Sequence, residues 1–161
     1  MLIRAYRASD LETVLDCFAR AVRETGALYY SAAQIAAWAP ETPDLDAWAR
    51  RLGTGGVFVA EADGLLAGFV RADADGLIDL LYVHPHRLRR GVASALLTAG
   101  CDWARAQGAR RFETQASRAA RPFFIAKGFR VEREQSVERN GVSLRNYLMI
   151  KDAGGQPARD L

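Results

Sequence analysis

The chain has 161 residues, half of them hydrophobic and a quarter charged, which suits one folded domain with a real core and argues against a disordered or fibrous chain. Its formal net charge is only +3 and no block of like charges is present, so a nucleic-acid partner is not expected. The apolar run within residues 1–7 is too short for a signal peptide and no later run could span a membrane, so we expect a cytoplasmic protein without a membrane partner.

The first third of the chain predicts one strand followed by helices. Ser31 and Gln34 have the spacing of a capping box, in which each residue satisfies the other's free backbone N–H, and Pro40 closes the short helix that follows. The expected elements are a strand over 2–6, a helix opened by a capping box over 9–12 and weakened at Gly26, a short helix over 31–38 and a helix over 44–52.

Three consecutive strands are predicted next, over 57–62, 65–70 and 77–83. Asp63-Gly64 between the first two is a type I′ hairpin signal, and Asp75-Gly76 marks a second turn before the third strand. The third strand is rich in aliphatic and aromatic residues, which is typical of a strand buried on both faces, and Asp79 is its single charge.

A basic turn follows this third strand. Arg89 and Arg90 lead into Gly91, and a helical pattern starts at Val92. The first N–H groups of a helix lack partners and lie at the positive end of its dipole, so with nearby arginines they can hold a phosphate group. The alternative is a solvated turn with ordinary surface arginines.

The C-terminal part predicts a strand over 111–116, a helix that Ser117 caps and Gly128 ends, and two strands over 130–138 and 142–150 joined by an Asn140-Gly141 hairpin. The tail over 152–161 contains two glycines and a proline and is expected to fray. This succession predicts a single α/β domain over 1–151 with a mixed, mostly antiparallel central sheet flanked by helices.

The segment Val83-His84-Pro85 followed by Gly91-Val92-Ala93-Ser94-Ala95-Leu96-Leu97 resembles the acetyl-CoA signature of the GCN5-related N-acetyltransferases. Leu88 stands where this family usually has Gln or Arg. The resemblance implies a sheet that splays between its fourth and fifth strands. It also implies that acetyl-CoA is held by the backbone of Leu81, Tyr82 and Val83 and by the loop Leu88, Arg89, Arg90, Gly91, Val92, Ala93 and Ser94.

A second segment, Ala120 to Phe129, is similar to the family segment that carries a tyrosine proposed to protonate the departing thiolate. Phe124 occupies that position and cannot donate a proton. Another hydroxyl could replace it, and Tyr147 in the last strand is our candidate, with Tyr82, Tyr29 and Tyr30 as alternatives. A thiolate could also leave without an acid.

Acetyl transfer to an alkylamine needs a neutral nitrogen, and a carboxylate commonly takes the proton because the ammonium pKa is about 10. Asp79 and Glu113 are the candidates, and simple strand alternation puts Asp79 on the same face as Leu81 and Val83. We expect both carboxylates to border the cleft where the fourth and fifth strands part. The alternative for Asp79 is a carboxylate satisfied by an arginine or an N–H group. For Glu113 the alternative is an outward-facing residue beside Arg111.

The expected acceptor is a small-molecule primary amine bound by Tyr29, Tyr30 and Gln34, whose aromatic surroundings suit an apolar or aromatic amine better than a polycation. These aromatics could instead only seal the helices to the sheet. A catalytically weak acyl-CoA-binding module, an acetyltransferase acting on a protein or aminoacyl-tRNA amine, and a homodimer are left open. No metal is expected, because the two histidines and two cysteines lack ligand spacing.

Overall fold

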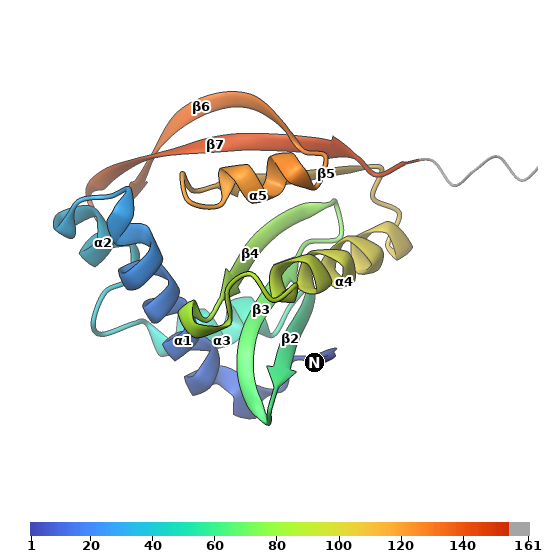
Figure 1. Ribbon diagram of the computed structural model, residues 1–161, viewed down its shortest axis with the longest axis horizontal. Helices are drawn as coiled ribbons and strands as arrows, with labels where there is room; N and C mark the ends of the chain where they lie inside the picture. Colours follow the sequence, from blue (N-terminus) through green and yellow to red (C-terminus); the bar gives the residue numbers. More distant parts are fainter. Residues whose placement is uncertain (155–161) are drawn as a thin grey trace, which may run out of the picture.

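A computed structural model describes residues 1–154 of the chain (Figure 1). Its seven strands form one sheet in the order β1-β2-β3-β4-β5-β7-β6. The strands are β1 (Leu2–Ala5), β2 (Gly56–Ala62), β3 (Leu65–Ala72), β4 (Leu77–Val83), β5 (Arg111–Ala116), β6 (Arg130–Arg139) and β7 (Val142–Asp152). The mixed, mostly antiparallel sheet predicted from the sequence is confirmed.

The sheet consists of two antiparallel halves that meet at a single parallel junction. β1 to β4 form one half and β5, β7 and β6 form the other. β4 and β5 pair only through Leu77 with Glu113 and Ile78 with Thr114, and beyond these pairs the two strands separate. In Figure 1, β6 and β7 lie on one side of the molecule and β2 to β4 on the other, so the predicted splay between the fourth and fifth strands is confirmed.

Helices cover both faces of the sheet, and each face has its own core. On one face α4 (Val92–Ala106) and α5 (Arg121–Ala126) pack through Leu96 and Phe124. On the other face α1 (Leu11–Arg20), α2 (Ala32–Trp38) and α3 (Leu45–Leu52) pack through Phe18, Ile35 and Leu52. A π-helical turn over Ala21–Thr25 and a 3-10 turn over Gly26–Leu28 continue α1, which agrees with the expected weakening at Gly26.

The turn signals in the sequence are confirmed, but the capping box predicted at residues 9–12 is wrong. Asp63 and Asn140, the first residues of the two tight hairpins, have φ of 54° and 48°, as type I′ turns require. Ser31 and Gln34 exchange the hydrogen bonds of a capping box. At the start of α1, Asp10 Oδ2 instead accepts the Arg7 N–H at 2.8 Å, so the Asp10 carboxylate caps the turn that leads into α1.

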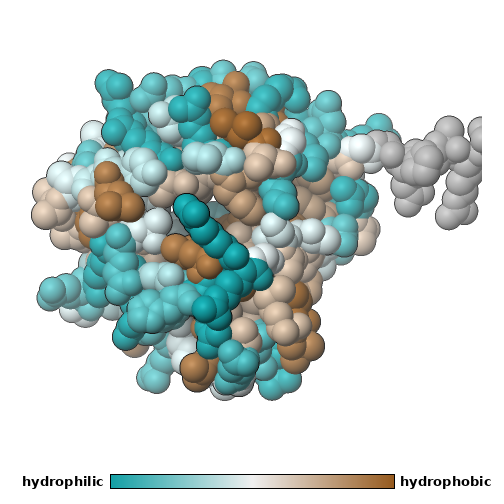
Figure 2. Space-filling model, in the orientation of Figure 1, coloured by the Kyte–Doolittle hydropathy of each residue, from teal (hydrophilic) through white to brown (hydrophobic). Residues whose placement is uncertain are grey.

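The described chain continues in regular structure past residue 151. β7 includes Asp152, and the N–H of the buried Ala153 donates to the Arg110 carbonyl at 3.0 Å. Residues 155–161 of the predicted tail lie outside the described residues. On the face seen in Figure 2, hydrophilic side chains predominate and hydrophobic ones form separate patches.

Candidate functional site

The strand β4 contains one extra residue at Asp79. This bulge determines which backbone groups of β4 point toward β3 and which point toward β5. In the ladder with β3, Ile78 pairs with Ala72 and Leu80 pairs with Arg71, so Asp79 has no partner. Before the bulge, the Ile78 carbonyl points toward β5 and accepts from Thr114 Oγ1 at 3.1 Å. Because a bulge shifts the alternation by one residue, the directions of all later backbone groups are reversed.

After the bulge, the backbone groups of Leu81 and Val83 point into the gap between β4 and β5. The His84 N–H donates to the Ala67 carbonyl on β3 at 2.8 Å, which fixes the direction of the even-numbered residues toward β3. Since successive residues of a strand alternate in direction, Leu81 and Val83 point the other way, where β5 has already diverged. Tyr82, the third residue predicted for this role, directs its backbone to Phe69 on β3 instead.

The basic turn ends in two residues with left-handed backbone conformation. Arg89 has a φ of 59° and Gly91 a φ of 78°, immediately before the fifteen residues of α4 begin at Val92. Such a turn directs successive N–H groups toward one point, next to the positive end of the helix dipole. Arg89 and Arg90 are exposed, and in residues 1–154 neither forms an ion pair.

The other residues of the predicted cofactor loop, and Arg87 just before it, have different environments. Arg87 pairs with Asp63 at 3.0 Å, so this arginine is tied to the β2–β3 hairpin. Leu88, at the position where the family has Gln or Arg, is 45% exposed. Val92 is buried in the core under α4, and Ala93 packs against that core, whereas Ser94 on the next position is half-buried. The loop therefore offers mainly backbone groups.

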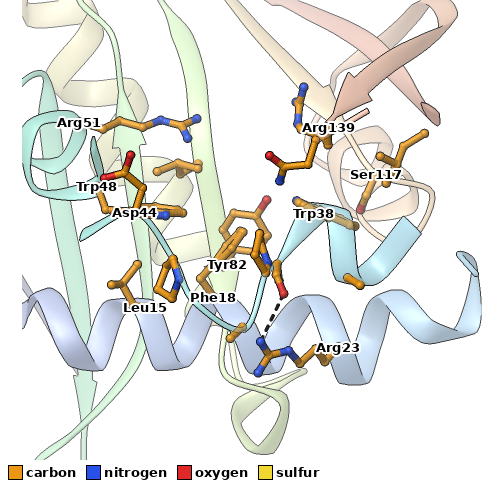
Figure 3. A pocket seen from close by; sticks show the side chains of 18 of the residues that line it. Leu15, Phe18, Arg23, Trp38, Asp44, Trp48, Arg51, Tyr82, Ser117 and Arg139 are labelled. Carbon is orange, nitrogen blue, oxygen red and sulfur yellow. Dashed lines mark hydrogen bonds between the residues drawn. The ribbon is translucent and has the colours of Figure 1, made fainter. Parts of the chain in front are cut away.

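A large cleft of about 1000 Å³ lies on the face of the sheet opposite α4, between the helices α1 to α3 and the strands β4, β5 and β7. Figure 3 shows Tyr82 near its centre, with Arg51 and Trp48 on one side and Trp38 and Arg139 on the other. Its floor is aromatic, because Phe18 and Trp38 pack edge-on against the Tyr82 ring at centroid distances of 4.9 and 6.4 Å. Such a floor favours an apolar or aromatic ligand.

The Tyr82 side chain was not predicted to line the large cleft, because its position depends on the bulge and on helices distant in sequence. Burial raises the pKa of its phenol to about 12, so the hydroxyl keeps its proton at neutral pH. Phe69 stacks on its other side at 5.6 Å. The ring therefore presents a fixed hydroxyl donor at the floor of the cleft.

Asp79 lies in this cleft and is held by two arginines. Its Oδ1 and Oδ2 accept from Arg51 Nη2 and Nε at 2.7 and 2.8 Å, and Oδ2 also accepts from Arg71 Nη1 at 3.0 Å. The sequence-based assignment of Asp79 to the face of Leu81 and Val83 is wrong, because the bulge turns it toward α3. The Arg51 contact had no local signal, since Arg51 lies 28 residues from Asp79 in sequence, and the Arg71 contact depends on the register of β3 against β4.

Glu113 is not in the large cleft. It lines a separate, smaller groove on β5, β6 and β7, and its carboxylate pairs with Arg111 on the same strand. The expectation that Glu113 and Asp79 border one cleft is therefore wrong. The neighbouring-arginine alternative describes Glu113 correctly.

Tyr147 and Phe124 lie on the face that carries α4 and α5. Tyr147 pairs with Ala116 in the last pair of the β5–β7 ladder, beside the gap, and the Arg121 guanidinium lies 4.7 Å from its ring centre. Phe124 is 3% exposed and packs between Phe123 and Phe129 at centroid distances of 5.2 and 5.1 Å.

Of the three residues predicted to bind the acceptor, only Tyr30 lines the large cleft. Its hydroxyl donates to the Arg145 carbonyl at 2.7 Å and accepts the Arg118 N–H at 3.1 Å, so it joins β7 to the loop after β5. The Gln34 side chain caps α2 and donates to the Ser143 carbonyl at 3.0 Å. Tyr29 lies outside the cleft and is 46% exposed. Trp38 at the end of α2 also lines the cleft.

Residues 1–154 contain no helix that is long and apolar enough to cross a membrane. In the same part of the chain, no three His, Cys, Asp or Glu side chains gather as a metal site would require.

Comparison with known proteins agrees with this geometry. Residues 27–151 match the family model described as an acetyltransferase (GNAT) domain. The chain is 35% identical over 147 residues to the uncharacterized N-acetyltransferase YafP of Escherichia coli K12, covering 91% of this chain and 93% of that protein.

Solved structures share the fold over nearly the whole chain. A GCN5-related N-acetyltransferase from Rhodopseudomonas palustris is 31% identical and superposes with a TM-score of 0.91 over 94% of each chain. YncA, a putative acetyltransferase from Salmonella typhimurium solved with acetyl-CoA, is 23% identical with a TM-score of 0.70 and covers 99% of this chain and 98% of its own.

Proposed function

The chain belongs to the GNAT family of N-acetyltransferases, and we propose that it transfers an acetyl group from acetyl-CoA to the primary amine of a small apolar or aromatic molecule. The observation that carries the proposal is the gap between β4 and β5. It leaves the Leu81 and Val83 backbone unpaired at the point where the large cleft meets the sheet.

The residues around this gap fit acetyl-CoA. The free backbone groups of Leu81 and Val83 suit the amide groups of a pantetheine chain, and the left-handed turn at Arg89 and Gly91, next to the start of α4, suits its pyrophosphate. Relatives with this fold are solved with acetyl-CoA or coenzyme A. Bound acetyl-CoA would supply the activated thioester, and the Leu81 N–H would stabilise the negative charge that develops on its carbonyl oxygen.

The acceptor would lie in the large cleft, against the Tyr82, Trp38 and Phe18 rings. Both carboxylate oxygens of Asp79 are bonded to arginines, so we propose that Asp79 anchors one end of the cleft and that the ammonium proton leaves to water through the open cleft. Tyr147, beside the gap on the face of α4, is the proposed proton donor to the departing thiolate.

The first test is binding. At about 100 times its dissociation constant, acetyl-CoA should stabilise the protein by about 2.7 kcal/mol in thermal unfolding, and NADH should not. Arg89→Glu with Arg90→Glu should abolish most of this shift. Arg133→Glu with Arg130→Glu on the outer strand β6, which changes the charge equally, should preserve it. An unchanged shift in the first variant would contradict the placement of the phosphate site.

The second test is turnover. Free-thiol release from acetyl-CoA should depend on an added amine such as 2-phenylethylamine. Phe124 favours a second candidate, an acyl-CoA-binding module with little catalysis, because the family's usual acid is missing. Binding of acetyl-CoA without amine-dependent thiol release across a broad amine panel would favour that candidate.

A further inference from the structure

Asn146 on β7 is an exception among the buried polar side chains. Four such residues lie in the described part of the chain: Asp10, Arg71, Thr114 and Asn146. Asp10 and Arg71 form ion pairs and Thr114 bonds to the Ile78 carbonyl, as buried polar groups normally do. Within residues 1–154, Asn146 Oδ1 is the one buried side-chain nitrogen or oxygen without a hydrogen-bond partner.

This unpartnered oxygen belongs to the wall of the acceptor cleft. Asn146 is 92% buried, since its relative exposure is 8%, and it lines the cleft from the β7 side. It directly precedes Tyr147, which forms the last β5–β7 pair, so it lies just beyond that pair, on the side where the sheet opens. Strand alternation puts it on the face of Leu144, which packs with α1 and α2.

The position of Asn146 is fixed by its neighbours. The Arg145 carbonyl accepts the Tyr30 hydroxyl at 2.7 Å, and Asn146 pairs with Gln135 on β6. A buried carbonyl oxygen without a donor is unfavourable for the free protein, so a residue held in this way makes sense when a ligand provides the donor. Because Asn146 lines the cleft, that ligand is the molecule bound there.

Several other acceptor groups that line the cleft are already in use. Asp79 is held by Arg51 and Arg71, Asp16 pairs with Arg20, and Asp44 Oδ1 accepts the Ala47 N–H at the start of α3. On the opposite wall the surface is aromatic, from Tyr82, Trp38 and Phe18. A ligand that meets both walls needs an aromatic body and an N–H donor.

We propose that Asn146 is the specificity residue for the acceptor: its Oδ1 accepts a hydrogen bond from the nitrogen of a primary alkylamine that carries an aromatic ring, and this ring lies on Tyr82, Trp38 and Phe18. This inference rests on the proposed acetyltransferase function and names the substrate class of the same cleft. It assigns recognition of the amine to an uncharged amide, with no carboxylate required at that point.

The test uses 2-phenylethylamine as the probe and the variants Asn146→Leu and Asn146→Ala. Loss of a hydrogen bond to a charged donor should raise the KM or Kd for this amine about tenfold or more, and leave the Kd for acetyl-CoA unchanged. Asn146→Leu should also unfold at the same temperature as the wild type or higher, because it removes an unsatisfied buried oxygen. A residue that only supports the fold would show a lower unfolding temperature instead.

Gln135→Leu is the matched control. It removes an amide from the partner of Asn146 in the ladder, on the same face but in the smaller groove, and should leave the amine KM unchanged. An amine KM in Asn146→Leu and Asn146→Ala within threefold of the wild type overturns the inference. If the wild type shows no turnover, calorimetry of 2-phenylethylamine binding decides: weaker binding in both Asn146 variants supports the inference, whereas equal binding or none overturns it. Failure of acetyl-CoA to bind would separately overturn the proposed function.

Discussion

Arg51 on α3 holds both carboxylate oxygens of Asp79 on β4, at 2.7 and 2.8 Å. Arg71 on β3 adds a third bond and also reaches the Arg51 carbonyl at 2.7 Å, so the bulge of β4 is fastened to the end of α3. Three hydrogen bonds from guanidinium groups already reach the Asp79 carboxylate, so its main role is to fix the shape of the cleft.

Asp79→Asn should therefore act on stability more than on catalysis. We expect a loss of about 1–2 kcal/mol in the free energy of unfolding, because two guanidinium groups lose a charged partner. The kcat/KM for 2-phenylethylamine should fall less than tenfold, and it should still rise with pH toward the pKa of the amine. A fall beyond a hundredfold with loss of that rise would identify Asp79 as the base. Glu113→Gln, in the separate groove, is the control and should change neither quantity.

Tyr147→Phe should lower kcat about a hundredfold and leave the KM for both substrates unchanged, if its hydroxyl protonates the thiolate. The measurement is steady-state thiol release, accompanied by thermal unfolding to show that the variant is folded. A kcat within threefold of the wild type would mean that the thiolate departs without this acid.

Phe124→Tyr, which restores the residue usual in the family, should not raise kcat. Phe124 is 3% exposed between two phenylalanine rings, so an added hydroxyl would be buried among apolar groups. We expect a loss of about 1–3 kcal/mol in the free energy of unfolding, measured with urea. A higher kcat in this variant would show that the position still reaches the leaving group.

Gly91→Ala tests how closely a ligand approaches the turn. Apart from the adjacent residues, no atom of residues 1–154 lies within 4 Å of the added Cβ, so the protein itself tolerates the substitution at a cost of about 1 kcal/mol of strain at a φ of 78°. The Kd for acetyl-CoA should rise at least tenfold. Gly141→Ala is closely matched, with the same φ and the same open surroundings in the β6–β7 hairpin, and should lower stability equally without affecting the Kd.

Asp10 should make the protein sensitive to acid. Hydrogen bonds from Arg4 hold the pKa of Asp10 below its ordinary value of 3.8, so its stabilisation is fully present above about pH 4 and is lost as the pH falls through the lower, folded-state pKa. At pH 7, Asp10→Asn should be about 3 kcal/mol less stable, and this difference should shrink below pH 4 in urea unfolding. The exposed Asp16→Asn is the control, and a constant difference for Asp10→Asn would contradict the assignment.

Features with a local cause could be predicted from the sequence. Asp63-Gly64 and Asn140-Gly141 specify tight hairpins through backbone preferences of adjacent residues, and Ser31 with Gln34 specifies a helix start within four residues. The basic turn before α4 is likewise local.

Features with a distant cause could not be predicted. The face occupied by Asp79 depends on an extra residue that is defined only against β3, and its partner Arg51 lies 28 residues away. Gln34 could serve a cap or a cleft, and only the position of β7 decides that it bonds to Ser143. Tyr82 and Asn146 come together with the cleft only when both halves of the sheet are assembled.

The gap between β4 and β5 also bears on self-association. Unpaired strand edges are where sheets of separate molecules join and aggregate, and proteins commonly protect them with charges or bulges. Here the unpaired groups of Leu81 and Val83 lie in the middle of a seven-stranded sheet, with folded strands on both sides. A strand of another molecule would have to enter between two packed halves, whereas a narrow, flexible ligand would not. The protein can thus keep unpaired backbone groups for ligand recognition without offering them to the strands of other molecules.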